Sequence, residues 1–313
     1  MTKPATPIFP KRVSIETIYG CNASCIMCPI DMASPRKKGV MPVALSDKIF
    51  EELAPYAEWI EKVDLFGLGE PLLDPHLLSR IHKAKSLGFK NLAISTNAEL
   101  LNEEKRTGLL ESGIETIIFS IDGIRAATHE GIRRKLHFPK LMANCAAMIR
   151  ERDAGNFRTR FVVRFIRQDA NRNEWDEYVE YWSKLLSGDR RDLLIRYDAH
   201  SWSGSLSSKD QHLHTLARDP YLEMKPCWHV FEHLVILVDG TVPLCSEDWH
   251  KATVNFGNIT SDTLLGIFNN KKFEAVRKLH SSCEKNKIGL CSECTVHYST
   301  PSKLVIVPQA LVA

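Results

Sequence analysis

Three cysteines, spaced by three and then two residues, occur in Cys21-Asn22-Ala23-Ser24-Cys25-Ile26-Met27-Cys28, directly after a short apolar run at 13–18. Thiolates are soft ligands, and three on one short loop can bind three irons of a cubane iron–sulfur cluster. A fourth local cysteine is missing, so one iron would stay open to an exogenous ligand. A zinc knuckle or incidental thiols would also place cysteines here. Zinc sites usually close with four Cys or His ligands, however, and the next twenty residues contain neither.

The composition of the chain is that of an ordinary globular protein. It has 313 residues, 44% of them hydrophobic and 25% charged, which suits one large domain and one small domain. The net charge is only +3, so charge gives no reason to expect a nucleic-acid or membrane partner. Nine cysteines without a signal-peptide core indicate metal binding in a reducing cytoplasm, where we expect the protein to reside.

Strand-like and helix-like segments alternate from about residue 13 to about residue 197. We expect strands near 13–19, 62–66, 91–95, 115–120, 159–166 and 193–197. We expect helices near 46–57, 75–88, 101–112, 138–152 and 172–186. Ser46 and Asp47 are start signals for the first helix, and Gly88 and Gly113 are stop signals. Six such units predict an α/β fold, a partial (β/α)6 barrel whose chemistry lies at the C-terminal ends of its strands.

Three further segments fall at expected strand ends: Gly69-Glu70-Pro71, Ser95-Thr96-Asn97-Ala98 and Ser120-Ile121-Asp122-Gly123. Together with the cysteine motif, they resemble the radical S-adenosylmethionine (radical SAM) enzymes. In that family a CxxxCxxC loop holds a [4Fe–4S] cluster whose open iron binds SAM. One electron from the cluster cleaves SAM to a 5′-deoxyadenosyl radical, which abstracts hydrogen from the substrate. Leu68 and Ala98 stand where the family usually has glycine.

The resemblance implies that Cys21, Cys25 and Cys28 bind the SAM-binding cluster. It implies SAM contacts from Met27, Gly69, Glu70, Pro71, Ser95, Asn97, Ser120 and Arg164, with Glu70 at the methionyl amino group.

Three charged residues keep two interpretations each. Arg164 lies inside a barrel strand and needs an anionic partner, either the SAM carboxylate or an internal carboxylate. Asp122 fits a polar role in its family segment and equally fits a cap for the following helix. Glu16 is either a substrate contact or a structural partner.

The strand–helix alternation ends at a turn-rich bridge at 201–225, and a cysteine-containing region follows it. Residues 235–245 predict a β-hairpin with a turn at Asp239-Gly240, and a helix is expected near 262–279. Cys227 and Cys245, followed by Cys291-Ser292-Glu293-Cys294, would by themselves suit a zinc ribbon. Beside the first motif, the region resembles the Twitch form of the SPASM domain.

That resemblance implies an auxiliary [4Fe–4S] cluster closed by Cys227, Cys245, Cys291 and Cys294. The expected domains are a radical SAM barrel at 1–200, the bridge, and a SPASM-like domain at 226–313.

The resemblance covers nearly the whole chain and implies a radical enzyme that receives electrons from a flavodoxin or ferredoxin-type donor. The first expected strand begins at residue 13, which leaves no room for an N-terminal peptide-recognition domain and favours a small-molecule substrate. A closed auxiliary cluster suits electron transfer. One Twitch module with this cysteine layout resembles the radical SAM dehydrogenases, and the resemblance implies oxidation of an alcohol carbon of a sugar, aminocyclitol or related metabolite.

Three alternatives remain. The first is an epimerase with Cys283 or Cys145 as hydrogen donor. The second is an enzyme that modifies a ribosomal peptide. The third, a non-enzymatic metal-binding protein, leaves the segments at Gly69 and Ser95 unexplained.

Overall fold

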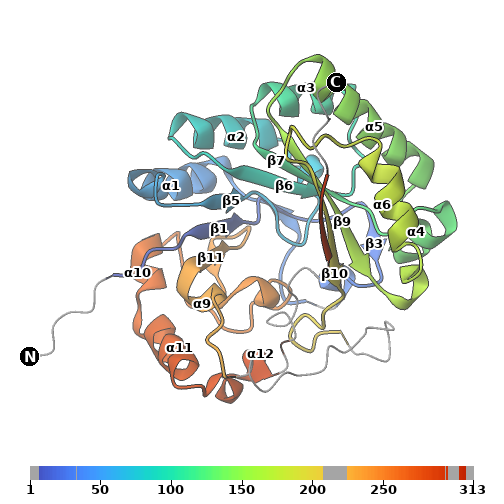
Figure 1. Ribbon diagram of the computed structural model, residues 1–313. Helices are drawn as coiled ribbons and strands as arrows, with labels where there is room; N and C mark the ends of the chain where they lie inside the picture. Colours follow the sequence, from blue (N-terminus) through green and yellow to red (C-terminus); the bar gives the residue numbers. More distant parts are fainter. Residues whose placement is uncertain (1–6, 33, 207–223, 293, 295–302, 308–313) are drawn as a thin grey trace, which may run out of the picture.

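The computed structural model describes residues 7–32, 34–206, 224–292, 294 and 303–307. One eight-stranded sheet, in the order β11-β1-β5-β6-β7-β9-β10-β14, forms the centre of the fold (Figure 1). Its strands are β1 Arg12–Ile15, β5 Lys62–Asp64, β6 Leu92–Thr96, β7 Thr116–Ser120, β9 Arg160–Arg167, β10 Leu193–Asp198, β11 His233–Ile236 and β14 Lys303–Ile306.

Six neighbouring strands, from β1 to β10 in this order, are parallel and match the six expected ones. The helices between them are α1 Val43–Leu53, α2 Leu77–Ser86, α3 Glu103–Glu111, α5 Phe138–Ala154 and α6 Trp175–Ser183. The expected partial (β/α)6 barrel is therefore confirmed. Gly88 and Gly113 follow α2 and α3 with φ of 91° and 69°, a left-handed conformation that favours glycine at helix ends.

Two expected helices have different boundaries. The first begins at Val43 instead of Ser46, because the Ser46 hydroxyl lies inside α1, donating to the Val43 carbonyl and accepting from buried Arg80. The expected helix at 262–279 is two helices, α10 Leu264–Phe268 and α11 Lys271–Ser281. The side chain of Asn270 accepts from two backbone N–H groups and starts α11, which explains the break.

The expected hairpin at 235–245 forms only next to its turn, where the Leu237 N–H donates to the Thr241 carbonyl at 2.9 Å. Its turn forms, with Gly240 at φ 85°, but β11 pairs in parallel with β1. The other arm, β12 Thr241–Val242, pairs with β13 Gly257–Asn258. A sequence pattern shows that a strand forms but not which distant strand completes its hydrogen bonds. β14, which pairs antiparallel with β10, was not expected at all.

Four short strands, in two pairs, place the cysteine loop. The expected strand at 13–19 breaks after β1, and its remainder, β2 Ile18–Tyr19, pairs with β4 Gly39–Val40. β3 Ser24–Cys25 pairs antiparallel with β8 Arg133–Arg134, which follows the unexpected helix α4 Ala126–Ile132.

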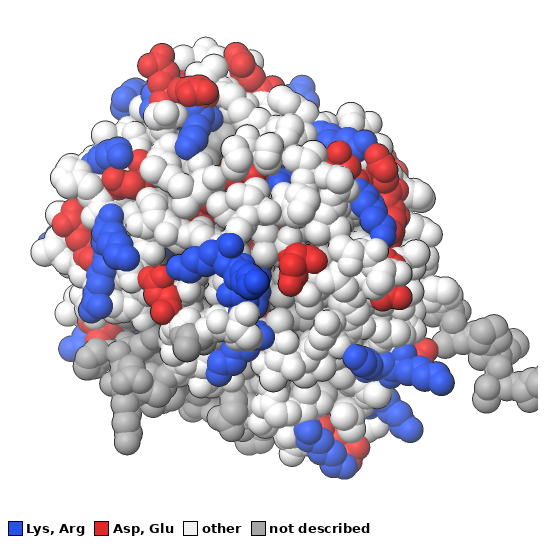
Figure 2. Space-filling model, turned by 180° about the vertical axis from the view of Figure 1, so that it is seen from behind, with Lys and Arg blue, Asp and Glu red and all other residues white. Residues whose placement is uncertain are grey.

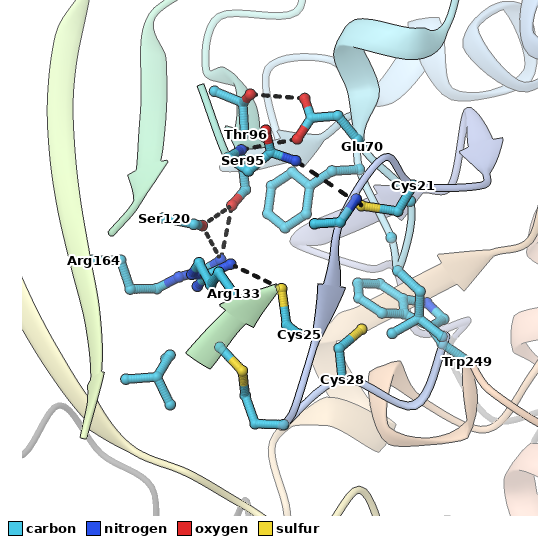
Figure 3. A pocket seen from close by; sticks show the side chains of 18 of the residues that line it. Cys21, Cys25, Cys28, Glu70, Ser95, Thr96, Ser120, Arg133, Arg164 and Trp249 are labelled. Carbon is cyan, nitrogen blue, oxygen red and sulfur yellow. Dashed lines mark hydrogen bonds between the residues drawn. The ribbon is translucent and has the colours of Figure 1, made fainter. Parts of the chain in front are cut away.

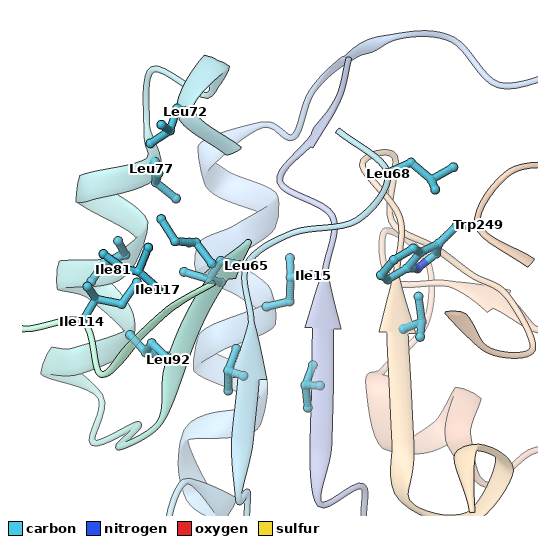
Figure 4. Close-up of a cluster of buried hydrophobic side chains, with 14 of the residues drawn as sticks. Ile15, Leu65, Leu68, Leu72, Leu77, Ile81, Leu92, Ile114, Ile117 and Trp249 are labelled. Carbon is cyan, nitrogen blue, oxygen red and sulfur yellow. The ribbon is translucent and has the colours of Figure 1, made fainter. Parts of the chain in front are cut away.

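A continuous apolar core joins the sheet to its helices. Ile15, Leu65, Leu92 and Ile117 project from neighbouring strands toward a layer that includes Ile81 of α2 (Figure 4). Each fully buried Leu or Ile contributes roughly 1.5–3 kcal/mol. The helices α9 His229–Glu232, α10, α11 and α12 Gly289–Ser292 gather beside the β11 end of the sheet (Figure 1).

The surface carries charges of both signs. On the face seen in Figure 2, Lys and Arg side chains are interspersed with Asp and Glu, with one group of basic side chains near the middle of the view. Within the described residues, no helix combines the length and apolar character needed to cross a membrane. Most of the expected bridge, 207–223, lies outside the described residues, and the domain boundaries stay a prediction.

Candidate functional site

The first three cysteines line one pocket at the C-terminal ends of the barrel strands (Figure 3). The antiparallel pairing of β3 with β8 holds Cys25 in place, and the N–H of Ile26 donates to the carbonyl of Ile132 at 3.0 Å. Burial raises the pKa of Cys21 and of Cys28 to about 12. These thiols are therefore neutral in the metal-free chain, and binding a metal would displace their protons.

The same pocket collects seven of the eight residues expected to contact SAM. They are Met27, Gly69, Glu70, Ser95, Asn97, Ser120 and Arg164. Pro71 is buried at the start of the short 3-10 helix η3 Pro71–Leu73 and does not line the pocket. Gly69 tolerates no side chain, since a Cβ there would lie 2.2 Å from the Ile18 carbonyl oxygen.

The Glu70 carboxylate is held by hydrogen bonds from other residues of the protein. Its carboxylate accepts from the Leu72 N–H at 3.1 Å, the Thr96 hydroxyl at 2.7 Å and the Asn97 N–H at 2.8 Å. Burial raises its pKa. These contacts use three of about four lone-pair sites and fix the loop after β5 to the end of β6.

Arg164 is a half-buried cation that faces the pocket. Its Nη2 donates to the hydroxyls of Ser95 at 2.8 Å and Ser120 at 2.9 Å, and the two hydroxyl oxygens are 3.1 Å apart (Figure 3). Among the described residues, no carboxylate lies within salt-bridge distance of Arg164. The internal ion pair is therefore not formed, and the guanidinium remains available to an anion in the pocket.

Sequence reasoning missed Arg133, which lies beside Cys25. Its Nη1 donates to the Cys25 sulfur at 3.8 Å, and its Nε forms a 2.7 Å ion pair with Asp122. Asp122 also accepts from the Ile166 N–H at 2.7 Å. It does not cap the following helix, because Arg125 is the N-cap residue of α4. Arg133 is separated from the cysteines by more than a hundred residues, and no local motif marks it.

Glu16 is a structural partner, buried beneath the pocket. It forms an ion pair with Arg36 and accepts from the N–H groups of Leu68 at 3.5 Å and Val238 at 3.3 Å. The substrate-contact interpretation does not hold, since Glu16 does not line the pocket.

Aromatic side chains close the other side of the pocket. The indole N–H of Trp202 donates to the Met27 carbonyl at 2.9 Å. His200, which lines the pocket, lies 3.0 Å from the carboxylate of Glu247. Trp249 also lines it, next to Cys28 in Figure 3. None of these residues was predicted from the sequence, because they come from the end of β10 and from the C-terminal region.

The C-terminal cysteines form a second group. Burial raises the pKa values of Cys245 and Cys291, and the charges of Cys227 and Cys294 raise both further. Cys245 immediately precedes the 3-10 helix η5 Ser246–Asp248. Within the described part of the chain, no three His, Cys, Asp or Glu side chains converge tightly enough to hold a single metal ion.

The two remaining cysteines lie elsewhere. Cys145 is fully buried in α5, and Cys283 is exposed, with its thiol donating to the Met224 carbonyl at 3.0 Å. Neither lines the pocket.

Comparison with known proteins identifies both parts of the chain. The Radical SAM superfamily model matches residues 15–163, and the SPASM model, described as an iron-sulfur cluster-binding domain, matches residues 227–295. An uncharacterized protein of Treponema pallidum is 35% identical over 311 residues, which cover 93% of this chain and 79% of that protein.

A relative with a named activity is similar over a comparable share of the chain. The S-adenosyl-L-methionine-dependent 2-deoxy-scyllo-inosamine dehydrogenase of Niallia circulans is 23% identical over 90% of this chain and 91% of that enzyme. The crystal structure of BtrN in complex with AdoMet and 2-DOIA superimposes with a TM-score of 0.63 at 20% identity, covering 93% of this chain and 94% of that one. Three further curated relatives are matched over only 43%, 32% and 53% of their own lengths.

The residues present fit the cofactors that these domains imply. Three sulfurs on one wall of the pocket form a soft donor set with one position left open. Arg164 supplies a half-buried positive charge on the same pocket that has no ion-pair partner among the described residues, and an anionic group such as a carboxylate would pair with it.

Proposed function

The chain belongs to the radical SAM superfamily and carries a C-terminal SPASM domain, and from this premise we propose that it oxidises an alcohol carbon of a sugar, aminocyclitol or related small molecule. Similarity to the Niallia circulans dehydrogenase along nearly the whole chain supports this reaction. [4Fe–4S] clusters and SAM are the cofactors of the two domains.

We assign the SAM-binding cluster to Cys21, Cys25 and Cys28. We assign the auxiliary cluster to Cys227, Cys245, Cys291 and Cys294. When bound, these clusters and SAM supply the radical that abstracts hydrogen from the substrate and an acceptor for the electron left behind.

The remaining pocket residues orient SAM and exclude water. Arg164, held by Ser95 and Ser120, is placed to bind the SAM carboxylate. Glu70 shapes the loop that carries Gly69, and its fourth lone-pair site is free to accept from the amino group. Trp202 and Trp249 form an apolar wall on the side where a substrate would lie.

We favour oxidation over epimerisation because no cysteine of the described residues other than the three of the first motif lines the pocket. An epimerase must return a hydrogen atom to the substrate radical, and a cysteine is the usual side chain for that step. All nine cysteines are described, and the only ones that line the pocket are the three of the first motif. Oxidation needs no such donor, since the radical carbon loses an electron and a proton to form a carbonyl.

The experiment is a product analysis in D2O with candidate alcohols, using the anaerobically reconstituted enzyme. We expect a carbonyl product, one 5′-deoxyadenosine for each turnover and no solvent deuterium at the reacting carbon. A product at unchanged oxidation level that carries deuterium at an inverted carbon would replace this proposal with epimerisation.

A further inference from the structure

His280 lies between two cysteines of the C-terminal group. It is only 1% exposed, in the last turn of α11. The backbone N–H of Cys227 donates to its Nδ1 at 3.1 Å. On the other side of the ring, Nε2 lies 3.6 Å from the sulfur of Cys291. One imidazole therefore touches two of the four residues assigned to the auxiliary cluster, from two segments far apart in sequence.

The hydrogen bond from the Cys227 N–H determines which ring nitrogen of His280 can donate to Cys291. Because Nδ1 accepts a hydrogen bond, the neutral imidazole of His280 carries its hydrogen on Nε2. That N–H faces the sulfur of Cys291 at a distance suited to the large radius of sulfur. A metal-bound thiolate has only lone pairs to offer, so the contact becomes an N–H···S hydrogen bond when Cys291 is a ligand.

One positively charged side chain, Lys285, lies on the same side. Lys285 is 6% exposed, and its ammonium donates to the Lys225 carbonyl at 3.2 Å. Its position places a positive charge close to the residues that follow α11.

We propose that His280 is a positioning residue for the auxiliary cluster, which holds the Cys227 backbone through Nδ1 and donates through Nε2 to the Cys291 sulfur. Hydrogen bonds to the sulfurs of an iron–sulfur site favour its reduced, more negative state. His280 therefore makes the auxiliary cluster a better electron acceptor. This inference rests on the ligand set assigned above, but its test needs no substrate.

The test measures the reduction potential of the auxiliary cluster alone. Replacing Cys21, Cys25 and Cys28 together by Ala removes the other cluster, and the full chain is then reconstituted and titrated with redox dyes under argon, followed by electron paramagnetic resonance. In this background His280→Leu removes both contacts of the ring. His280→Gln offers an amide oxygen to the Cys227 N–H and an amide N–H to Cys291. Lys278→Leu, at an exposed position of the same helix, is the control.

We expect His280→Leu to lower the equilibrium constant for one-electron reduction about tenfold, a fall in potential of about 59 mV. His280→Gln should recover most of the loss, and Lys278→Leu should match the parent. Loss of iron in the Leu variant with retention in the Gln variant would also support the positioning role. The proposal is overturned if His280→Leu keeps its iron and the parent potential, or if Gln and Leu lose iron equally. A parent that holds no auxiliary iron would instead refute the ligand assignment.

Discussion

The Arg164 guanidinium of β9 donates a 2.8 Å hydrogen bond to the Ser95 hydroxyl of β6, past the intervening strand β7, and it has no carboxylate partner among the described residues. Burial lowers the pKa of Arg164, as expected for a cation held in a poorly solvated place. Such an arrangement is costly in the free chain and favourable once an anion enters the pocket.

Arg164→Met should weaken SAM binding about 10- to 100-fold, since hydrogen bonds to charged groups contribute about 1.5–3 kcal/mol. Isothermal titration of SAM against the reconstituted protein measures this. The melting temperature of the metal-free variant should not fall, because a half-buried charge without an ion-pair partner among the described residues is removed. Arg167→Met, on the same strand but paired with Asp198, is the control and should leave SAM affinity unchanged. Unchanged affinity in the Arg164 variant would rule out its role as the carboxylate contact.

The iron content tests the two cysteine groups together. The wild-type chain reconstituted without oxygen should hold about eight irons, and replacing Cys21, Cys25 and Cys28 by Ala should leave about four, by the cysteine-ligand rule for [4Fe–4S] clusters. The triple variant should also lose reductive SAM cleavage. One equivalent of zinc with only four irons in the wild type would show that the C-terminal cysteines form a zinc ribbon.

Much of the fold and pocket could be predicted because the signals are local. The strand–helix alternation and the Cys21–Cys28 spacing are read within short windows, and parallel strand ends necessarily meet at one edge of the sheet. Gly69, Ser95, Ser120 and Arg164 lie together for that reason.

The remaining features depend on contacts between distant segments. Arg133 reaches Cys25 through a two-residue strand pair, and β11 takes β1 as its partner although more than two hundred residues separate them. His280 has no pattern around it that distinguishes it from a surface helix residue. Such contacts are fixed by packing, which single-sequence periodicity does not report.

Oxidation without a thiol donor predicts that Cys283→Ala and Cys145→Ala both retain product formation. Cys283 is exposed, so its variant should also keep full stability. Cys145 is buried, and its variant should lose about 1 kcal/mol of stability from the smaller side chain. Product analysis and urea unfolding measure the two effects. If either variant cleaves SAM normally yet forms no product, that cysteine takes part in the reaction.

Gly69→Ala should disrupt the pocket, because the new Cβ would lie 2.2 Å from the Ile18 carbonyl oxygen and 2.8 Å from that of Gly20. Backbone must move to relieve this contact, at a cost of about 1–3 kcal/mol, and the cysteine loop moves with it. We expect SAM cleavage to be lost. Gly131→Ala is the matched control, since nothing lies within 4 Å of its added Cβ. That helical position should gain about 0.5–1 kcal/mol. Normal SAM cleavage by the Gly69 variant would show that the pocket does not require glycine at this position.

The ion pair between Arg36 and Glu16 ties the cysteine loop to the C-terminal region, because Arg36 also donates to the Trp249 carbonyl and Glu16 accepts from the Val238 N–H. Both side chains are at most 7% exposed. Glu16→Gln should therefore cost about 3–5 kcal/mol, since the Arg36 charge stays buried without its partner. The double variant with Arg36→Met should lose clearly less stability than the sum of the two single losses. Urea unfolding of the metal-free chain measures this in a double-mutant cycle.

The exposed Lys90–Glu58 pair is the control. Lys90→Met should change the free energy of unfolding little, because surface ion pairs contribute little. If the buried and exposed variants lose the same stability, Glu16 does not anchor the cysteine loop.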